Sequence, residues 1–355
     1  MRTVINQSRL RRNAQDALVT LEDALGDKVV GQPSAVSAIV PYVQIYQSNL
    51  SPEGRPAGVF LLLGPSGTGK TRTVEALAGI LHGNEKNLLK VDCGEFQMEH
   101  EVAKLIGAPP GYLGHRETQP LLTQARLNSV TSEHSTLSII LLDEIEKAAP
   151  SMARLLLGVL DKATLRLGDN NIVNFERSLI FMTSNLGARE MMRTHEPDFG
   201  FQAVMAGQDS NIESRIEKIG LNAVRRKFSP EFVNRIDAVV AYQPLSREAL
   251  EAILEQQLNL FRHHIYTRLG LRAFFVNVSG EAKAFLLEQG TSSQYGAREL
   301  KRTIHRNLMQ PIAAMVSQNQ VPPASAVNVT QRKGEDSLSF DIELDPMRKS
   351  RRLAS

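Results

Sequence analysis

The chain has 355 residues, enough for about two domains, and its 42% hydrophobic and 22% charged residues exclude a fibrous or disordered protein. The formal net charge of +3 is small, and part of it lies in the tail residues 348–352, so charge gives no indication of nucleic-acid binding. The single cysteine, Cys93, excludes an internal disulfide and argues against a cysteine-rich zinc site, and the lack of an apolar run of ~20 residues predicts a cytoplasmic protein without a membrane span.

The N-terminal part of the chain predicts helices ahead of the first strand. Apolar residues at helical spacing over residues 6–25 indicate a leading amphipathic helix. Gly31 interrupts the chain, and Pro33 suits the first turn of a second helix, which Pro41 is expected to bend. The stretch SNLSPEGRPAG is typical of a loop that leads into a strand.

The segment from Val59 to Thr71, VFLLLGPSGTGKT, has the pattern of a phosphate-binding loop between a strand and a helix. Its glycines allow tight turns that direct backbone N–H groups toward phosphate oxygens. The lysine supplies a positive charge for the outer phosphates, and the Thr71 hydroxyl is placed to bind Mg²⁺. The predicted nucleotide-binding residues are Gly64, Pro65, Ser66, Gly67, Thr68, Gly69, Lys70, Thr71 and Arg72.

Three further apolar runs predict buried strands that end near Asp92, at Asp143 and at Asn185. Helices are predicted over residues 118–127 and 152–163, and LRLGDNNIVNF predicts a hairpin that turns at residues 169–171. Between the second strand and the first of these helices lies a loop, rich in glycine and proline, with Tyr112 at its tip. Strands that alternate with helices predict an α/β fold, with a parallel sheet covered by helices on both faces.

Residues 187–208 are polar and are predicted to be irregular, before a helix and a last short strand, AVVAYQPL. After a domain boundary near Pro244, helices over 246–269, 280–289 and 296–317 alternate with short strands, which predicts a smaller α+β domain. The expected divisions are a leading helix over 1–24, a large ATPase domain over 25–244, a small domain over 245–345 and a basic tail over 346–355.

In addition to a phosphate loop, hydrolysis requires a bound metal ion and an activated water. Asp143 and Glu144 could supply these two functions. Asp143 would hold Mg²⁺ through its water shell, and Glu144 would orient and polarise the attacking water. Asn185 closes the next buried strand and can reach the same water through its amide. These residues therefore predict a nucleoside triphosphatase.

Six motifs occur in the order and about the spacing of the Clp family of AAA+ protein unfoldases: GPSGTGKT, GAPPGYLGH, LLDEIEKA, MTSNLG, FSPEFVNRID and YGARELKR. The resemblance covers roughly residues 25–345 and is greatest to the second ATPase module of the two-ring members. It implies an AAA+ core with a small C-terminal domain, ATP and Mg²⁺ as cofactors, and an ATPase coupled to protein remodelling. Residues that match by position are the Walker pairs Lys70 with Thr71 and Asp143 with Glu144, the first sensor Asn185, the adenine-contacting Val30 and Gly31, the arginine finger Arg235 and the second sensor Arg298.

The resemblance also implies partners. A finger donated to the neighbouring subunit's nucleotide makes activity depend on a ring of identical subunits, which the family suggests is sixfold. Tyr112 and Leu113 match the loop that lines the axial channel and grips a polypeptide substrate. Phe199, Gly200 and Phe201 stand where protease-coupled members carry a loop that docks on the ClpP peptidase, although an aromatic residue replaces the usual aliphatic one.

The chain departs from the family pattern in several places. Ser229 replaces an arginine in the finger motif, and ETQP replaces a doubled glycine after the pore loop. Extra polar residues around 128–136 lengthen the segment that leads to the strand ending at Asp143. No N-terminal substrate domain and no first ATPase ring are recognised, so we expect substrate choice to come from elsewhere, for example from an adaptor protein. A regulatory ATPase that threads nothing and a nucleic-acid loader remain as alternatives; the intact hydrolytic residues argue against the first, and GYLG without a basic aromatic stripe argues against the second.

Overall fold

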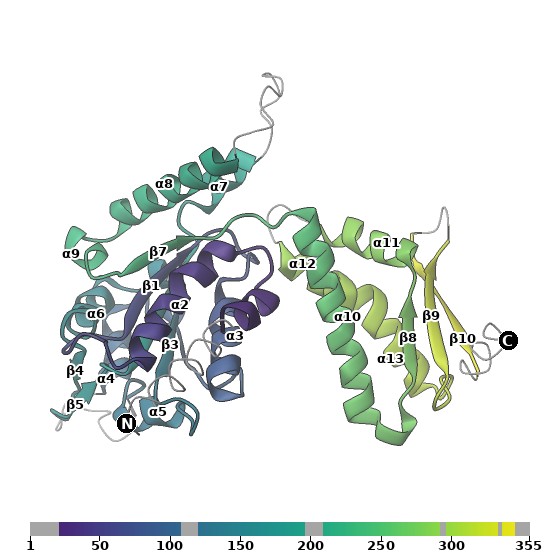
Figure 1. Ribbon diagram of the computed structural model, residues 1–355, viewed down its shortest axis with the longest axis horizontal. Coiled ribbons are helices and arrows are strands. Elements are labelled where there is room, and N and C mark those ends of the chain that lie inside the picture. Colours follow the sequence, from purple (N-terminus) through teal and green to yellow (C-terminus); the bar gives the residue numbers. More distant parts are fainter. Residues whose placement is uncertain (1–20, 108–119, 196–208, 292–295, 333–335, 345–355) are drawn as a thin grey trace, which may run out of the picture. The chain divides into compact units, whose positions relative to one another are not determined.

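A computed structural model of the chain describes residues 21–107, 120–195, 209–291, 296–332 and 336–344. The chain divides into two compact units between Pro244 and Leu245 (Figure 1). Residues 21–28 are helical, and Leu21 and Leu25 are buried, whereas the rest of the predicted leading helix lies outside the described residues. Among the helices in the described ranges, none has the length and apolar character needed to cross a membrane.

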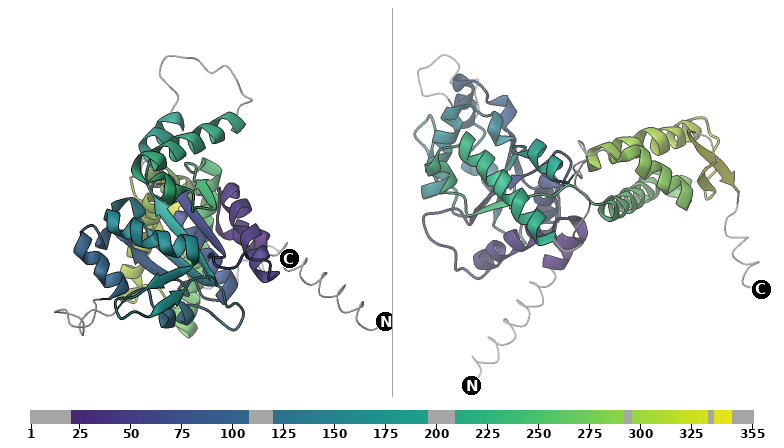
Figure 2. Two further views of the ribbon diagram at one scale, coloured as in Figure 1. Left: turned by 90° about the vertical axis from the view of Figure 1, so that its left-hand side faces the viewer. Right: turned by 90° about the horizontal axis from the view of Figure 1, so that it is seen from above.

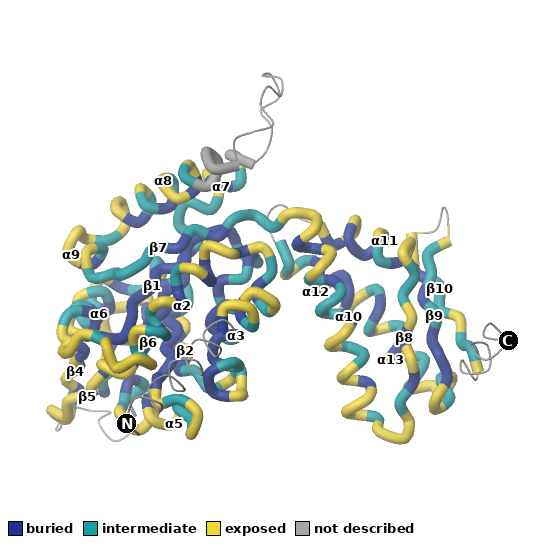
Figure 3. The backbone as a smooth tube through the Cα atoms, viewed as in Figure 1, coloured by how far each residue is buried: buried dark blue, intermediate teal, exposed yellow. Residues whose placement is uncertain are grey.

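A parallel sheet forms the centre of the first unit, with the strand order β2 (Leu89–Asp92), β3 (Ser138–Asp143), β6 (Ser178–Ser184), β1 (Gly58–Leu63) and β7 (Ala238–Ala241). All residues of β1 and β6 are buried, because these strands lie inside the sheet and both of their faces are covered (Figure 3). This burial explains why they are continuous apolar runs in the sequence rather than alternating patterns.

The two faces of the sheet carry separate hydrophobic cores (Figure 1, Figure 2). Alternate residues of β1 point to opposite faces, so that Val59, Leu61 and Leu63 join one core and Phe60 and Leu62 join the other. The first core is covered by α6 (Pro150–Lys162) and α8 (Asp209–Lys227). The second is covered by α2 (Pro33–Gln47) and α3 (Lys70–His82).

Shorter elements connect these layers. They are η1 (Cys93–Glu95), η2 (Glu99–Val102), α4 (Ala103–Ile106), α5 (Gln124–Ser129), η3 (Ile145–Lys147), the antiparallel hairpin of β4 (Thr164–Arg166) and β5 (Ile172–Asn174), α7 (Ala188–His195) and α9 (Pro230–Val233). The hairpin confirms the prediction made from its turn residues.

The second unit combines four α-helices with a sheet of three strands in the described residues. Strand β9 (Ala326–Gln331) is antiparallel to β10 (Leu338–Glu343) and parallel to β8 (Phe275–Val278). The remaining elements are α10 (Arg247–Leu269), η4 (Gly270–Arg272), α11 (Gly280–Gly290), α12 (Ala297–Ile304), the π-helical η5 (His305–Met309) and α13 (Gln310–Ser317). The α/β fold with a smaller α+β unit is therefore confirmed.

Two sequence predictions are wrong. The helix expected over 118–127 begins only at α5, because Leu121 and Leu122 donate backbone hydrogen bonds to carbonyls of the α4 region and Thr123 then caps α5. The segment expected to be irregular begins with α7 instead. Met191 of this helix is fully buried, and Gly220 of α8 leaves room for it, since a Cβ there would lie 2.8 Å from Met191 Cε.

Replacing Gly64 tests how closely the end of β1 approaches β7. A Cβ at Gly64 would lie 2.6 Å from the backbone oxygen of Tyr242, and its φ is 144°. We expect Gly64→Ala to lower the free energy of unfolding by at least about 3 kcal/mol. Gly83→Ala is the matched control, because Gly83 also has a positive φ of 74° but has no atom within 4 Å, and its cost should be about 1 kcal/mol. Equal effects in thermal unfolding would contradict this prediction.

Candidate active site

The phosphate loop follows β1 and ends where α3 begins. Gly64, Gly67 and Gly69 have positive φ values of 144°, 80° and 110°. Glycine adopts this backbone conformation readily, whereas a residue with a Cβ atom would be strained in it. Helix α3 starts at Lys70, so its first backbone N–H groups are directed toward the loop, which favours an anion there. The chain between β1 and α3 thus has the backbone geometry that its glycine pattern predicts.

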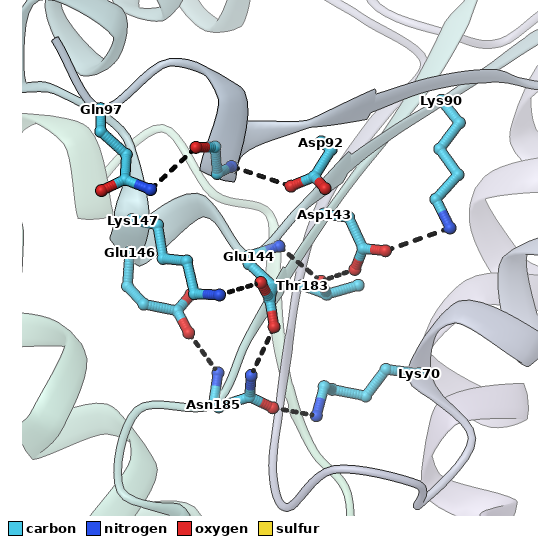
Figure 4. A network of polar contacts seen from close by, with 11 residues as sticks. Lys70, Lys90, Asp92, Gln97, Asp143, Glu144, Glu146, Lys147, Thr183 and Asn185 are labelled. Carbon is cyan, nitrogen blue, oxygen red and sulfur yellow. Dashed lines mark hydrogen bonds and ion pairs between the residues drawn. The ribbon is translucent and has the colours of Figure 1, made fainter. Parts of the chain in front are cut away.

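Lys70 places a buried charge at the phosphate loop, and Figure 4 shows its contact with Asn185. Its side chain is buried, and its Nζ donates hydrogen bonds to the carbonyl oxygens of Gly64 at 2.6 Å and Pro65 at 2.9 Å and to Asn185 Oδ1 at 3.0 Å. A buried ammonium is costly unless several acceptors surround it. Phosphate oxygens offer the same lysine stronger, charged acceptors, so the chemistry of this position fits a nucleotide triphosphate.

Gln32 and Tyr242 support the loop from the side of β7. The Gln32 side chain is almost fully buried; its Nε2 donates to the carbonyls of Thr68 at 3.2 Å and Gln243 at 2.9 Å, and its Oε1 accepts from the Gln243 N–H at 3.2 Å. The buried Tyr242 hydroxyl donates to Thr73 Oγ1 at 2.7 Å, and burial raises the pKa of this tyrosine, so it stays protonated as a donor. Sequence reasoning missed both residues.

Val30 and Gly31, which the resemblance assigns to the adenine, directly precede Gln32. Val30 is half-buried and Gly31 is exposed with a φ of 76°. Pro33 begins α2, as predicted. The predicted adenine contact is thus adjacent in sequence to a residue that holds the phosphate loop.

Asp143 ends β3 and makes two polar contacts. Its Oδ1 accepts from Thr183 Oγ1 at 2.5 Å, and its Oδ2 lies 3.2 Å from Lys90 Nζ (Figure 4). Thr183 Oγ1 in turn accepts from the Glu144 N–H at 3.0 Å. A carboxylate and the half-buried Thr71 hydroxyl are hard oxygen donors, which fit the Mg²⁺ predicted at these two residues.

Glu144 lies in a left-handed backbone conformation, with φ 57° and ψ 50°. Such strain in a residue other than glycine is enriched at functional sites. Its Oε1 accepts from Asn185 Nδ2 at 3.3 Å, and its Oε2 pairs with Lys147 Nζ at 2.5 Å (Figure 4). The hydrogen bond to Glu144 raises the pKa of Lys147. The strained backbone therefore places the predicted water-activating carboxylate between an amide and an ammonium group.

Asn185 connects Lys70, the first residue of α3, with Glu144, which follows β3. Its Oδ1 accepts from Lys70 while its Nδ2 donates to Glu144, and its backbone N–H donates to Glu146 Oε1 at 2.9 Å. The other oxygen of Glu146 is buried and has no hydrogen-bond partner among the described residues. Lys90, Glu146, Lys147 and Thr183 were not predicted as site residues, although Glu146 and Lys147 lie in LLDEIEKA and Thr183 lies in MTSNLG.

The buried Cys93 lies beside this acidic group. Burial, followed by the negative charges of Asp143 and Asp92, raises the pKa of the thiol far above its usual range. Cys93 is therefore a neutral packing residue of the core.

Arg235 follows α9 in the first unit, and Arg298 belongs to α12 in the second unit. Arg235 Nε pairs with Asp161 Oδ1 at 3.2 Å, and Arg298 is exposed on α12 in the second unit. Ser229, which replaces the expected arginine, caps α9 by accepting from the Phe232 N–H at 3.3 Å. Tyr112, Leu113 and residues 199–201 lie outside the described residues, so their predicted roles stay predictions.

The phosphate loop connects a strand of the parallel sheet to a helix, and an acidic strand end and an asparagine lie beside it. This combination defines an α/β nucleotide-binding ATPase module. Residues 55–239 match the family described as AAA domain (Cdc48 subfamily), and residues 245–329 match the C-terminal, D2-small domain of ClpB protein. The chain belongs to this family of AAA ATPases, and its resemblance to the second ATPase module of Clp proteins is confirmed.

Similar proteins agree with this assignment. Heat shock protein 104 of Schizosaccharomyces pombe is 34% identical over 333 residues, which cover 94% of this chain and 35% of that protein. Chaperone protein ClpB of Meiothermus ruber is 35% identical over 344 residues, which cover 97% of this chain and 37% of that protein. The solved complex of S. cerevisiae Hsp104 with casein has a TM-score of 0.76 and 29% identity and covers 91% of this chain and 52% of that chain. The chain spans little more than a third of the curated relatives' length.

Separate variants distinguish phosphate binding from hydrolysis. We expect Lys70→Ala to abolish ATP binding, because it removes the buried charge at the loop, whereas Glu144→Gln should bind ATP and lose at least ~10²-fold in kcat. Lys86→Ala, which removes an exposed lysine beyond α3, is the control and should match the parent. Binding is measured with a fluorescent ATP analogue and turnover by phosphate release. A Glu144→Gln variant with parental kcat would contradict the assignment.

Proposed function

We propose that the chain is the ATPase motor of a Clp-type protein-remodelling machine, which hydrolyses ATP in a ring and pulls on polypeptide. The observation that carries the proposal is the Asn185 amide, which contacts both Lys70 and Glu144. It joins the group suited to phosphate with the group suited to water, as a hydrolytic site requires. The similarity to ClpB and Hsp104 supports a protein substrate, because Hsp104 was solved with casein.

The chain's own residues have distinct parts in this hydrolysis. Lys70 and the backbone N–H groups of the phosphate loop bind the outer phosphates. Thr71 and Asp143 would hold Mg²⁺, which would neutralise phosphate charge. The carboxylate of Glu144 polarises the attacking water and accepts its proton, while the Asn185 amide orients that water. Lys147 pairs with Oε2 of the Glu144 carboxylate. Water activation therefore requires this ion pair to loosen, or the water to share the carboxylate with Lys147.

Arg235 completes the site only if a second subunit supplies it. In the proposed ring, which we expect to be sixfold, its guanidinium reaches the neighbouring nucleotide and stabilises the charge of the transferring phosphoryl group. Arg298, on the second unit, would contact the nucleotide that Lys70 of its own subunit binds, and hydrolysis would then drive a hinge motion between the two units. Tyr112 and Leu113 would transmit this motion to the polypeptide substrate. An adaptor protein would deliver that substrate to the ring. Peptidase docking through residues 199–201 stays a prediction from the sequence.

Subunit mixing tests whether the finger acts between subunits. We expect Arg235→Ala to lose about 10³-fold in ATPase activity with little change in ATP affinity. Mixing Arg235→Ala with Glu144→Gln should restore activity, because an intact Glu144 in one subunit then meets an intact Arg235 from its neighbour. Arg226→Ala, which removes an exposed arginine of α8, is the control. Two inactive variants that stay inactive in a mixture of demonstrated rings would contradict the proposal.

An unfolding assay tests the polypeptide motor. We expect Tyr112→Ala to keep ATP hydrolysis within about twofold of the parent and to lose unfolding of a fluorescent protein substrate, because the loop grips the chain without touching the nucleotide. Glu144→Gln should lose both activities. Unfolding that is unaffected by Tyr112→Ala, or a parent that hydrolyses ATP but never unfolds substrate, would favour a regulatory ATPase.

A further inference from the structure

Arg235 projects from a segment whose backbone is fixed on both sides. On its N-terminal side, Phe232 is almost fully buried and stacks on Phe228 with ring centroids 5.0 Å apart. On its C-terminal side, Asp237 Oδ2 accepts from the Val59 N–H at 2.8 Å, and the Asp237 N–H donates to the Val59 carbonyl at 2.9 Å. The backbone at Arg235 is thus tied to the core and to β1, and only its long side chain still has to be oriented.

Asp161 supplies that orientation. It lies in the last turn of α6, next to Val159 and Leu160, which are buried in the core. Its Oδ1 pairs with Arg235 Nε at 3.2 Å, and the two side chains are 37% and 38% exposed. Arginine binds phosphate oxygens through a planar fork of N–H donors, so the orientation of the whole guanidinium decides whether that contact forms.

We propose that Asp161 is a positioning residue for Arg235, which limits the orientations of the guanidinium that would serve the neighbouring nucleotide; this rests on the proposed function. The alternative is a latch that withholds the arginine. An exposed ion pair changes an equilibrium by about fivefold at most, so either role would change the rate only modestly, and the two roles differ in direction. A latch would lower the kcat of the parent protein, whereas a positioning contact that limits the many rotamers of a long side chain would raise it.

The experiment compares Asp161→Asn with matched variants as full chains. We expect Asp161→Asn to lower the kcat of ATP hydrolysis about fivefold, with unchanged KM for ATP and unchanged ring assembly in sedimentation. Asp161→Glu should recover most of the activity. Glu99→Gln breaks the comparable exposed pair with Arg154 on the same helix, at 3.5 Å, and should have no effect. In an Arg235→Ala background, Asp161→Asn should cause no further loss, which a merely structural role would not predict.

The outcomes separate this inference from the proposed function. Parental kcat in Asp161→Asn, together with a large loss in Arg235→Ala, overturns the role of Asp161 and leaves the finger in place. No loss in Arg235→Ala overturns the proposed function itself. A higher kcat in Asp161→Asn would identify a latch, and a loss matched by failed ring assembly would identify an interface residue; both overturn the positioning role.

Discussion

The ammonium group of Lys70 is the constraint on which the geometry of the site depends. It is buried, and an unpaired charge in this environment would cost several kcal/mol. Its acceptors come from the end of β1 and the end of β6, which lie side by side because Leu63 pairs with Ser184 in the parallel register. A slip of one residue would turn Asn185 to the other face of the sheet. The register of two central strands therefore decides whether Lys70 and Glu144 share an amide.

The opposite neighbour of β1 fixes the loop itself. After β7, Tyr242 and Gln243 contact Thr73 and Gln32, and Gln32 holds the carbonyl of Thr68. The loop is thus supported from β6 through the side chain of Lys70 and from β7 through hydrogen bonds to its backbone. Dipoles that are fixed before a ligand arrives need no reorganisation during the reaction, which makes their stabilisation of developing charge effective.

Sequence reasoning succeeded where function is encoded in contiguous segments. The phosphate loop, the acidic strand end and Asn185 each follow an apolar run, and parallel strands bring their carboxyl ends to one edge. It missed Gln32 because that side chain bonds a residue 211 positions away, through a strand order that no local pattern reveals. It missed Thr183 and Glu146 for the same reason, since their partners lie 40 and 39 positions away. The error at α7 has a different cause, because the buried Met191 and its neighbour Met192 are too few apolar residues among charged ones to show a helical period.

Helix α6 gives the proposed ring a physical route between neighbouring sites. It begins at Pro150, shortly after η3 with Lys147, which contacts Glu144, and it ends beside Asp161, which contacts Arg235. Met152 and Leu156 are buried in the core on its inner face, so the two ends of the helix belong to one packed element. A displacement at Glu144 on hydrolysis would then reach the base of the arginine that serves the next nucleotide.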